Sequence, residues 1–471
     1  MLPQLEQAKA PIHGLLEALA YRTRDEPVFP EEKPLHQIRF SAASPDARLL
    51  WWGAPLSAFP QTLSLSAYSL TMWHLSPIAF ILLAYACSAA NFALLLAPLH
   101  LVPERTKHLV AAVLICAQFL VPILFRCDYI TLIFGISAFG LGLIYRFLDL
   151  FYITPLMYRR PVQYTRDEVL SEILFMFQSP RYRMTLSRNR ESNSDAKEEK
   201  PACGDKHVVS WIALLPRFVR HYLFADLVRF YFATFTYERY ANLTPAQFIL
   251  FSIACMLCIS SNLMWMVELI EMVGALIFNR GLIDIDRFPA IFKAPWAATS
   301  LTDFWSVRWH QSFRSGFMGV GWYPLRRLVR ERMIPYFGKN SGFHALELLL
   351  PTLGVFIASG LLHEYVTLTH PHARRPWLMV VFFILHGLGV AVEKTIGGFL
   401  KRRITWLNRE DNRMLLSVIG WLWTSAFLLA TFPLFFDFFA RVDMWKEVGE
   451  QPGFYTWLRG ASRAQVLAST L

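Results

Sequence analysis

Residues 346–365 of this 471-residue chain read LELLLPTLGVFIASGLLHEY, and this stretch decides the class of the fold. Between Glu347 and His363 no ionisable residue occurs over about four helical turns. With its flanks the apolar run covers 342–363, which is long enough for an α-helix to cross the hydrocarbon core of a bilayer.

Apolar runs of the same kind recur along the chain, and its composition agrees with them. Hydrophobic residues make up 55% and charged residues only 17%, whereas about a quarter of residues are charged in a typical soluble domain. We therefore expect an all-α integral membrane protein and exclude disordered, collagen-like and disulfide-framework classes. The clear runs lie at 77–99, 109–126, 129–157, 246–278, 342–363, 376–400 and 414–438.

A further candidate span, 211–236, is rich in Phe, Leu and Tyr but contains ionisable residues that are costly at a bilayer centre. These residues are Arg217, Arg220, Asp226 and Arg229. Counting this span gives a bundle of about eight transmembrane helices, with most Lys and Arg on one side and both termini in the lumen. If residues 211–236 do not cross the membrane, the alternative is that they lie in the membrane interface. The stretches predicted to be cytosolic are 100–108, 158–209, 279–341 and 401–413.

The apolar runs divide the chain into five regions. The polar loop 158–209 contains the charged tract RNRESNSDAKEEK, which cannot bury enough apolar surface to order itself. The regions are an N-terminal extramembrane segment 1–76, first transmembrane helices 77–157, the polar loop 158–209, a transmembrane core 210–440 and a C-terminal tail 441–471.

The net charge of +11 is scattered among membrane-length segments, so basic loops facing a lipid bilayer explain it better than nucleic acid does. The six cysteines lie mostly in or beside apolar runs and are interpreted as packing residues. His370 and His372 stand apart from other histidines, and neither a metal site nor a covalent nucleophile is predicted.

His363 is the first candidate for chemistry. A histidine in so apolar a run is desolvated, and its neutral form suits a general base. On a helix, Ser359 and Gly360 lie one turn earlier on the same face and leave room for a substrate. The alternative is a structural histidine that is hydrogen-bonded across helices or placed at the membrane surface.

A second candidate is residues 300–317, SLTDFWSVRWHQSFRSGF. If this stretch is helical, Asp303, His310 and Arg314 share one face while Trp305 and Trp309 share another. Arg pairs with phosphate and Trp stacks on a purine, so Arg308 and Arg314 with the two tryptophans suit a phosphate-bearing ligand. The alternative is an interfacial helix, in which Trp and Arg are the expected belt residues.

The third candidate is FFILHGLGVAVEK, in which His386 and Glu393 share a helix face beside small residues. This polar stripe either lines a cavity or packs against another helix, and we favour packing.

Together these stretches resemble a known family. DFWSVRWHQSFR at 303–314, ASGLLHEYV at 358–366 and the following FFxLHGxGVxxE pattern are similar to the wax-synthase branch of the membrane-bound O-acyltransferase superfamily. The resemblance covers about residues 280–400. It implies that His363 is catalytic and that His310 occupies the partner position, which is Asn in sterol acyltransferases.

The resemblance implies direct transfer of an acyl group from acyl-CoA to an alcohol inside an intramembrane reaction chamber, with no acyl-enzyme and no permanently bound cofactor. His310 would orient the substrate or stabilise the oxyanion. The implied partners are a hydrophobic alcohol, acyl-CoA and the bilayer. The residues expected to bind substrate or CoA are Trp305, Arg308, Trp309, Arg314, Ser359 and His386, with Arg326, Arg327 and Arg330 near the arriving phosphates.

The FW-x-x-RWHQ form resembles relatives from filamentous fungi that acylate hydroxylated terpenoids. It implies acetyl transfer from acetyl-CoA to a terpenoid or meroterpenoid in secondary metabolism, at the endoplasmic reticulum. A long-chain wax-ester or sterol acyltransferase is the alternative within the same chemistry. From another class, the alternative is a transporter that uses His363, His386 and Glu393 as a proton path.

Overall fold

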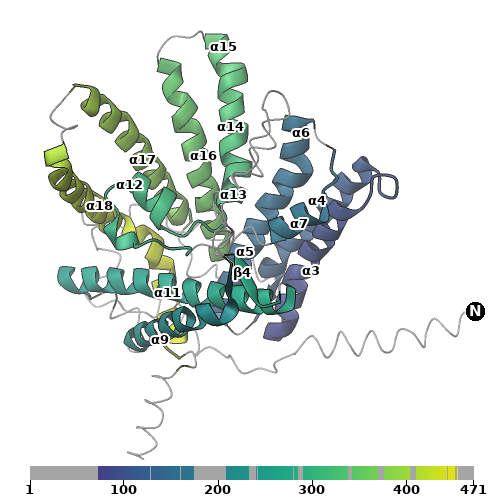
Figure 1. Ribbon diagram of the computed structural model, residues 1–471, viewed down its shortest axis with the longest axis horizontal. Coiled ribbons are helices and arrows are strands. Elements are labelled where there is room, and N and C mark those ends of the chain that lie inside the picture. The colour runs from purple at the N-terminus through teal and green to yellow at the C-terminus, as the bar shows by residue number, and fades with distance from the viewer. Residues whose placement is uncertain are drawn as a thin grey trace, which may run out of the picture.

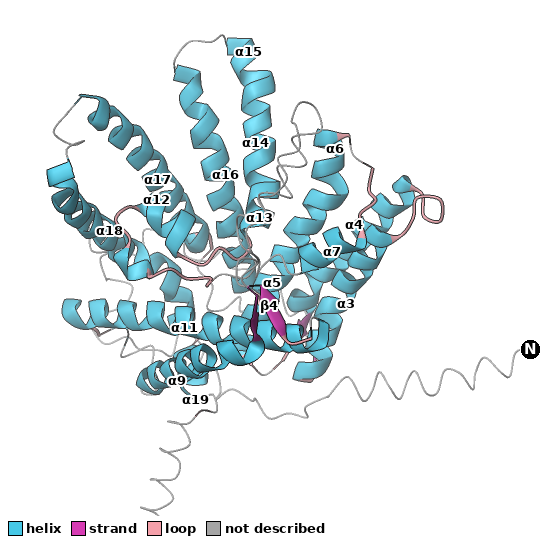
Figure 2. Cartoon of the chain, in the orientation of Figure 1, coloured by secondary structure: helices cyan, strands magenta, loops and turns pink. Residues whose placement is uncertain are grey.

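The computed structural model of the chain is almost entirely helical in the part that it describes (Figures 1 and 2). It describes residues 73–453 except 128, 160, 174–207, 233–239, 241, 279, 285–289, 338–341, 370–375, 404–409, 443 and 451–452. Most of the predicted N-terminal segment 1–76, loop 158–209 and tail 441–471 therefore lies outside the described residues.

Among the described residues, seven helices are long and apolar enough to cross a membrane. Each of the seven coincides with one of the apolar runs of the sequence. The prediction of an all-α, multi-pass integral membrane protein is confirmed. One of the seven spans comprises α5 (Ile130–Leu148), the π-helical η4 (Asp149–Ile153) and most of α6 (Thr154–Tyr158). The others are α3 (Pro77–Leu96), α4 (Glu104–Leu124), α11 (Pro245–Phe278), α16 (Gly342–Thr367), α17 (Leu378–Arg403) and α18 (Arg413–Arg441).

Two short ribbons join the ends of neighbouring helices. β1 (Trp73–His74) pairs in parallel with β2 (Phe125–Arg126) beside α3 and α4. β3 (Val208–Ser210) pairs antiparallel with β4 (Leu282–Asp284).

The candidate eighth span forms η5 (Trp211–Leu214) and α9 (Leu215–Phe232), which pack along α11. α9 is not among the seven helices, because its ionisable side chains lower its hydropathy. Two of them, Asp226 and Arg229, are buried. The described residues thus contain seven span-length apolar helices where the charge distribution favoured eight.

Residues 314–337 correct a second expectation, since they are helical where the sequence predicted part of a long loop. They form one continuous helical run that packs against α16, and two of its turns are widened to the π-helical form. Arginines late in this run interrupt its apolar pattern, so the pattern does not predict a span there. Its parts are α13 (Arg314–Phe317), η8 (Met318–Trp322), α14 (Tyr323–Leu328), η9 (Val329–Met333) and α15 (Ile334–Phe337).

The run 314–337 and α16 form an antiparallel hairpin that extends from the centre of the molecule to its edge (Figure 1). Their backbones meet most closely where Gly321 faces Gly354. A Cβ atom on Gly321 would lie only 2.6 Å from the carbonyl carbon of Gly354, so a side chain cannot fit there without moving a helix.

The hairpin packs on α5 at the centre of the molecule. The Tyr145 hydroxyl of α5 donates to the carbonyl of Ala358 on α16 at 3.0 Å. The buried Arg146 guanidinium binds Asp149 at 2.6 Å and Glu172 at 2.5 Å, and it reaches the carbonyl of Ser315 at 3.4 Å. These contacts hold the start of the run 314–337 in place.

The remaining short elements connect the longer helices. They are α7 (Arg166–Ile173), η6 (Pro295–Ala297), α12 (Leu301–Asp303), η7 (Phe304–Arg308), η11 (Glu410–Asn412) and α19 (Met444–Glu450). Residues 300–314, which include α12 and η7 and which we call the site segment, enter between α17 and α18 (Figure 1).

Candidate active site

His363 lies one turn before the end of α16, with its ring partly buried. Its Nδ1 atom is 2.8 Å from the carbonyl oxygen of Ser359, one turn earlier. A carbonyl only accepts, so Nδ1 donates and Nε2 presents a lone pair. Phe383 stacks on the imidazole with ring centroids 4.6 Å apart, and Phe435 meets it at 5.2 Å. Ser359 thus binds the imidazole through its backbone carbonyl, and its predicted contact with substrate or CoA stays a prediction.

The site segment starts with a fully capped helical turn. The Ser300 hydroxyl accepts from the N–H of Asp303 at 2.9 Å. The Glu393 carboxylate of α17 accepts from the N–H groups of Leu301 at 2.7 Å and Thr302 at 3.0 Å. The first N–H groups of a helix have no partner within the helix, and these contacts supply one for each.

The helix of the site segment ends at Arg308, because Trp309 adopts extended backbone angles (φ −74°, ψ 153°). The stretch is therefore not helical throughout, which is the condition under which Asp303, His310 and Arg314 would share one helix face. The turn before this break is π-helical, a form found frequently at functional sites.

Gln311 stabilises the break in the helix. Its side-chain Nε2 donates to the carbonyl of Trp305 at 3.1 Å and to that of Trp309 at 2.7 Å. Phe313 then takes a left-handed conformation (φ 63°), which redirects the chain into α13. The rings of Trp305 and Trp309 remain close, with centroids 6.3 Å apart and planes at 70°.

Trp305 connects the site segment to α16, which contains His363, and to α17, which contains His386. Its ring meets His386 at 5.3 Å and both Phe383 and Phe356 at 5.7 Å. Since Phe383 also stacks on His363, one aromatic cluster joins the site segment to that imidazole. The Trp305 Nε1 donor is buried and has no hydrogen-bond acceptor.

His310 follows the helix break and packs against Phe292 and Trp309, with ring centroids 5.6 and 5.5 Å away. Its Nδ1 atom is buried without a partner. Burial, and then the neighbouring charge of His363, lower the pKa of His310 to about 3. The His310 ring is therefore neutral at physiological pH.

The Arg308 guanidinium is engaged by its own chain. Its Nε lies 2.5 Å from Asp303, and its Nη1 donates to the carbonyls of Ala294 at 3.2 Å and Lys293 at 3.3 Å. In this state Arg308 fixes the fold of the site segment, and its predicted contact with a phosphate stays a prediction.

Arg314 has a similar part at the far end of the segment. It donates to the carbonyl of Ser306 at 3.1 Å and to the side-chain oxygen of Gln311 at 2.8 Å. Burial lowers the pKa of Arg314, with Tyr323 acting in the opposite direction. Its predicted role in CoA binding likewise stays a prediction.

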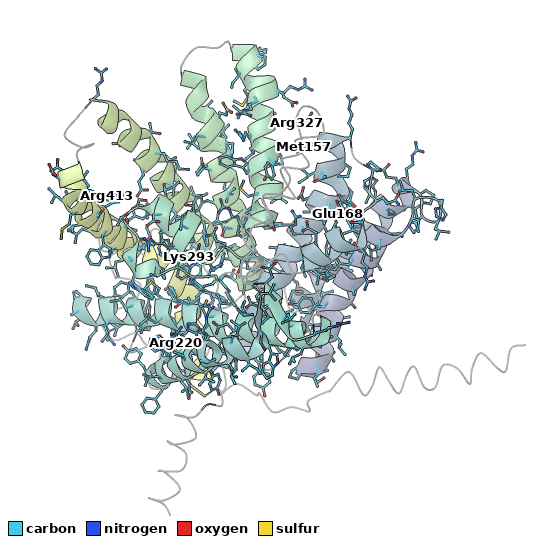
Figure 3. All side chains as sticks on the ribbon, viewed as in Figure 1. Met157, Glu168, Arg220, Lys293, Arg327 and Arg413 are labelled. Atoms are coloured by element: carbon cyan, nitrogen blue, oxygen red, sulfur yellow. The ribbon has the colours of Figure 1, made fainter. Side chains whose placement is uncertain are left out.

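The other arginines predicted to meet CoA phosphates lie from the middle of the run 314–337 outward. Arg330 pairs with Glu347, which lies about 24 Å along α16 from His363 at 1.5 Å per residue. Figure 3 shows Arg327 beside Met157, well apart from Lys293 beside the site segment. The structure therefore does not bring these arginines to the predicted catalytic histidine.

His386 is fully buried in α17 and supports packing rather than an open cavity. Its Nδ1 donates to the carbonyl one turn earlier at 2.8 Å, and its Nε2 faces the Thr431 hydroxyl at 3.4 Å. One turn further along α17, Gly389 leaves space for the Leu301 side chain. The predicted polar stripe is thus the surface of α17 on which the site segment packs.

Three residues of the site were not singled out from the sequence. Gln311 closes the helix break, Phe383 joins Trp305 to His363, and Trp423 of α18 donates to Glu393 at 2.8 Å. Phe383 had a readable signal, since it lies one turn before the buried His386. Gln311 and Trp423 make contacts that depend on the tertiary structure, and a local sequence pattern does not predict them.

Comparisons with known proteins match the part of the chain that contains the site segment and His363. Residues 288–385 match the model of the membrane bound O-acyl transferase family. A long-chain-alcohol O-fatty-acyltransferase of Simmondsia chinensis is 32% identical over 127 residues, which are 27% of this chain and 33% of that protein. The acyl-CoA–sterol O-acyltransferase 1 of Arabidopsis thaliana is 32% identical over 123 residues, which are 25% of this chain and 32% of that protein. The chain spans about a third of the length of these curated relatives. The similarity to membrane-bound O-acyltransferases therefore covers the stretch that contains Trp305, His310 and His363.

Proposed function

We propose that the protein transfers an acyl group from acyl-CoA to the hydroxyl of a hydrophobic alcohol within the membrane, as a membrane-bound O-acyltransferase. One observation carries this proposal. The family-like stretch 288–385 contains both the site segment and His363, and the fold joins them through Phe383.

His363 is the general base of this proposal. With Nδ1 bound to the Ser359 carbonyl, Nε2 is free to accept the proton of the substrate hydroxyl. The hydroxyl oxygen bonds to the thioester carbon, the carbon–sulfur bond breaks, and the CoA thiolate leaves. The imidazolium returns its proton to that thiolate. No acyl-enzyme forms, so both substrates are bound together.

His310 orients the substrate or stabilises the oxyanion that develops on the thioester carbonyl. Its neutral, buried ring has one nitrogen without a protein partner, which supports such a hydrogen bond to substrate. The apolar surroundings exclude water and so limit hydrolysis of the thioester.

For the finer specificity we propose an acetyl donor, acetyl-CoA, and a terpenoid or meroterpenoid acceptor. The FW-x-x-RWHQ form of the site segment supports this choice. Phe383 and Phe435 pack against His363 and form apolar walls beside the proposed base. The predicted location is the endoplasmic reticulum membrane, and the predicted reaction chamber would open by movement of these rings.

A long-chain alcohol or sterol acyltransferase is the second candidate, and the names of the relatives favour it. The transporter alternative has less support, because Glu393 is engaged with backbone N–H groups and His386 with a carbonyl. In these contacts neither group belongs to an open proton path.

The proposal is tested with microsomes that contain the protein and labelled acetyl-CoA or a long-chain acyl-CoA. Each donor is paired with a hydroxylated terpenoid mixture, a long-chain alcohol or a sterol. We expect ester only with acetyl-CoA and the terpenoids, and none above background for His363→Ala. Ester from a long-chain donor would transfer the assignment to the second candidate. Full activity of His363→Ala would remove the imidazole from the mechanism.

A further inference from the structure

Glu393 binds the start of the site segment with its whole carboxylate. One oxygen accepts from the N–H of Leu301 at 2.7 Å, and the other accepts from the N–H of Thr302 at 3.0 Å and its hydroxyl at 3.2 Å. We propose that Glu393 is a positioning residue, which sets where Trp305 and His310 lie relative to His363. The inference rests on the proposed function for its kinetic consequences, but its structural part is measurable without activity.

The site segment and α17 run antiparallel in register, starting from Glu393. Leu301 lies against Gly389, and one turn later Trp305 lies against His386 and Phe383. A slip of one residue along α17 would move the segment by about 1.5 Å and rotate its contacts by about 100°. The carboxylate prevents such a slip because it binds two consecutive N–H groups.

Trp423 of α18 adds a third element to the contacts of the Glu393 carboxylate. Its indole Nε1 donates to the Glu393 oxygen that also binds Leu301, at 2.8 Å. A neighbouring indole, that of Trp421, donates to the carbonyl of Trp296 at 2.8 Å, just before the site segment. Three elements, α12, α17 and α18, therefore meet at one side chain.

Small displacements of this segment matter for the reaction. A misplacement of about 1 Å far from the reacting atoms can lower a rate by about 10²-fold. The path from Glu393 to the imidazole is short, because Trp305 lies one turn after Leu301 and contacts Phe383, which stacks on His363. Loss of the carboxylate should therefore lower turnover more than substrate binding.

The chain offers a matched control in Glu447 of α19. This carboxylate binds the start of α5 in the same manner, accepting from the N–H of Ile130 at 2.6 Å, the N–H of Thr131 at 2.9 Å and the Thr131 hydroxyl. It does so away from the site segment. Any general effect of removing a carboxylate cap appears in both variants, whereas an effect on the reaction appears only in one.

The experiment compares Glu393→Gln, Glu447→Gln and Trp423→Phe in the full-length protein. Hydrogen–deuterium exchange is the first readout. We expect the peptide with residues 301–310 to exchange faster in Glu393→Gln and, to a smaller extent, in Trp423→Phe. In Glu447→Gln the peptide with residues 130–136 should change instead. Unchanged exchange of 301–310 in Glu393→Gln would overturn the inference whatever the protein catalyses.

Kinetics with the acyl-CoA and alcohol pair that the wild type accepts is the second readout. We expect Glu393→Gln to lose about tenfold or more in kcat, with a smaller change in KM for acyl-CoA. It should also release more CoA per ester formed, because the alcohol is no longer aligned. Glu447→Gln should keep the wild-type kcat and CoA-to-ester ratio. Equal losses in both variants would contradict a positioning role, whereas wild-type protein that forms no ester would contradict only the proposed function.

Discussion

A hydrogen bond to a single carbonyl determines which ring nitrogen of His363 carries the proton. Its position in an apolar run identifies the residue from sequence, because an ionisable side chain there is conspicuous. The sequence does not reveal which ring nitrogen accepts a proton, since that follows from the contact with Ser359. Gln311 was missed for the opposite reason. It is a polar residue in a polar stretch, and only the bend of the chain brings its amide to two carbonyls.

His310 gives a prediction about acid stability. Its pKa is lowered to about 3, below the ordinary value of 6.5, so the unfolded chain binds a proton between these values that the folded chain does not. The contribution of His310 to stability is therefore present above about pH 6.5 and is lost as the pH falls toward 3. We expect the melting temperature of detergent-solubilised His310→Asn to fall less than that of the wild type between pH 7 and pH 4.

The same variant tests the function of the side chain. Asn retains hydrogen-bonding groups near the position of Nδ1, so we expect His310→Asn to retain a measurable part of the wild-type ester formation. His310→Ala should lose about 10²-fold or more in kcat, as expected for loss of an oxyanion donor. Equal melting curves for wild type and His310→Asn at every pH, or equal rates for the Asn and Ala variants, would contradict these roles.

At the scale of elements, the sequence predicts the spans well and the site segment poorly. A membrane helix is determined by the sum of many apolar side chains, so its position survives local exceptions such as Pro351 in α16. The break at Trp309 instead depends on the Gln311 side chain and the left-handed Phe313, both of which need tertiary contacts. Helical periodicity alone therefore does not predict this break.

The hairpin of residues 314–337 with α16 gives a prediction for this scale. Gly321→Ala places a Cβ against the backbone of Gly354, which we expect to destabilise the protein by about 1–3 kcal/mol and to lower activity. Gly274→Ala in α11 is the matched control, because no described atom beyond its neighbours and the nearby backbone of its own helix lies within 4 Å of the added Cβ. Thermal unfolding in detergent should show a lower melting temperature for Gly321→Ala only. A loss of the same size in both variants would show that the close crossing is not what matters.

At the scale of the whole molecule, contacts between neighbouring elements lie at two opposite ends of the helices. At one end, Glu447 of α19 binds the start of α5, and β1 pairs with β2. At the other end, Arg327 donates to the carbonyl of Met157 and Glu104 accepts from the N–H of Val162. The distribution of Lys and Arg predicts termini in the lumen and the arginine-bearing end in the cytosol, and this orientation stays a prediction. The exact count of spans was not predictable, because α9 and the run 314–337 both mix charges with apolar residues.

Cysteine labelling tests this orientation. In a cysteine-free variant, we expect Arg332→Cys to react with a membrane-impermeant maleimide in intact microsomes, whose outer face is cytosolic. Tyr129→Cys, at an exposed position before α5, should react only after permeabilisation. The reverse pattern would invert the topology while leaving the fold unchanged.

The contact between Gly321 and Gly354 also makes the hairpin a pivot. Arg330 and His363 lie on opposite sides of this point, each about 13 Å from it along its own helix. A rigid tilt of one helix by about 5° would shift its far end by about 1 Å, which is the scale on which reaction rates respond. Because Arg330 pairs with Glu347 of α16, a displacement of the arginine-bearing end by a lipid surface or a bound polyanion would tilt α16 and so move His363 at its other end.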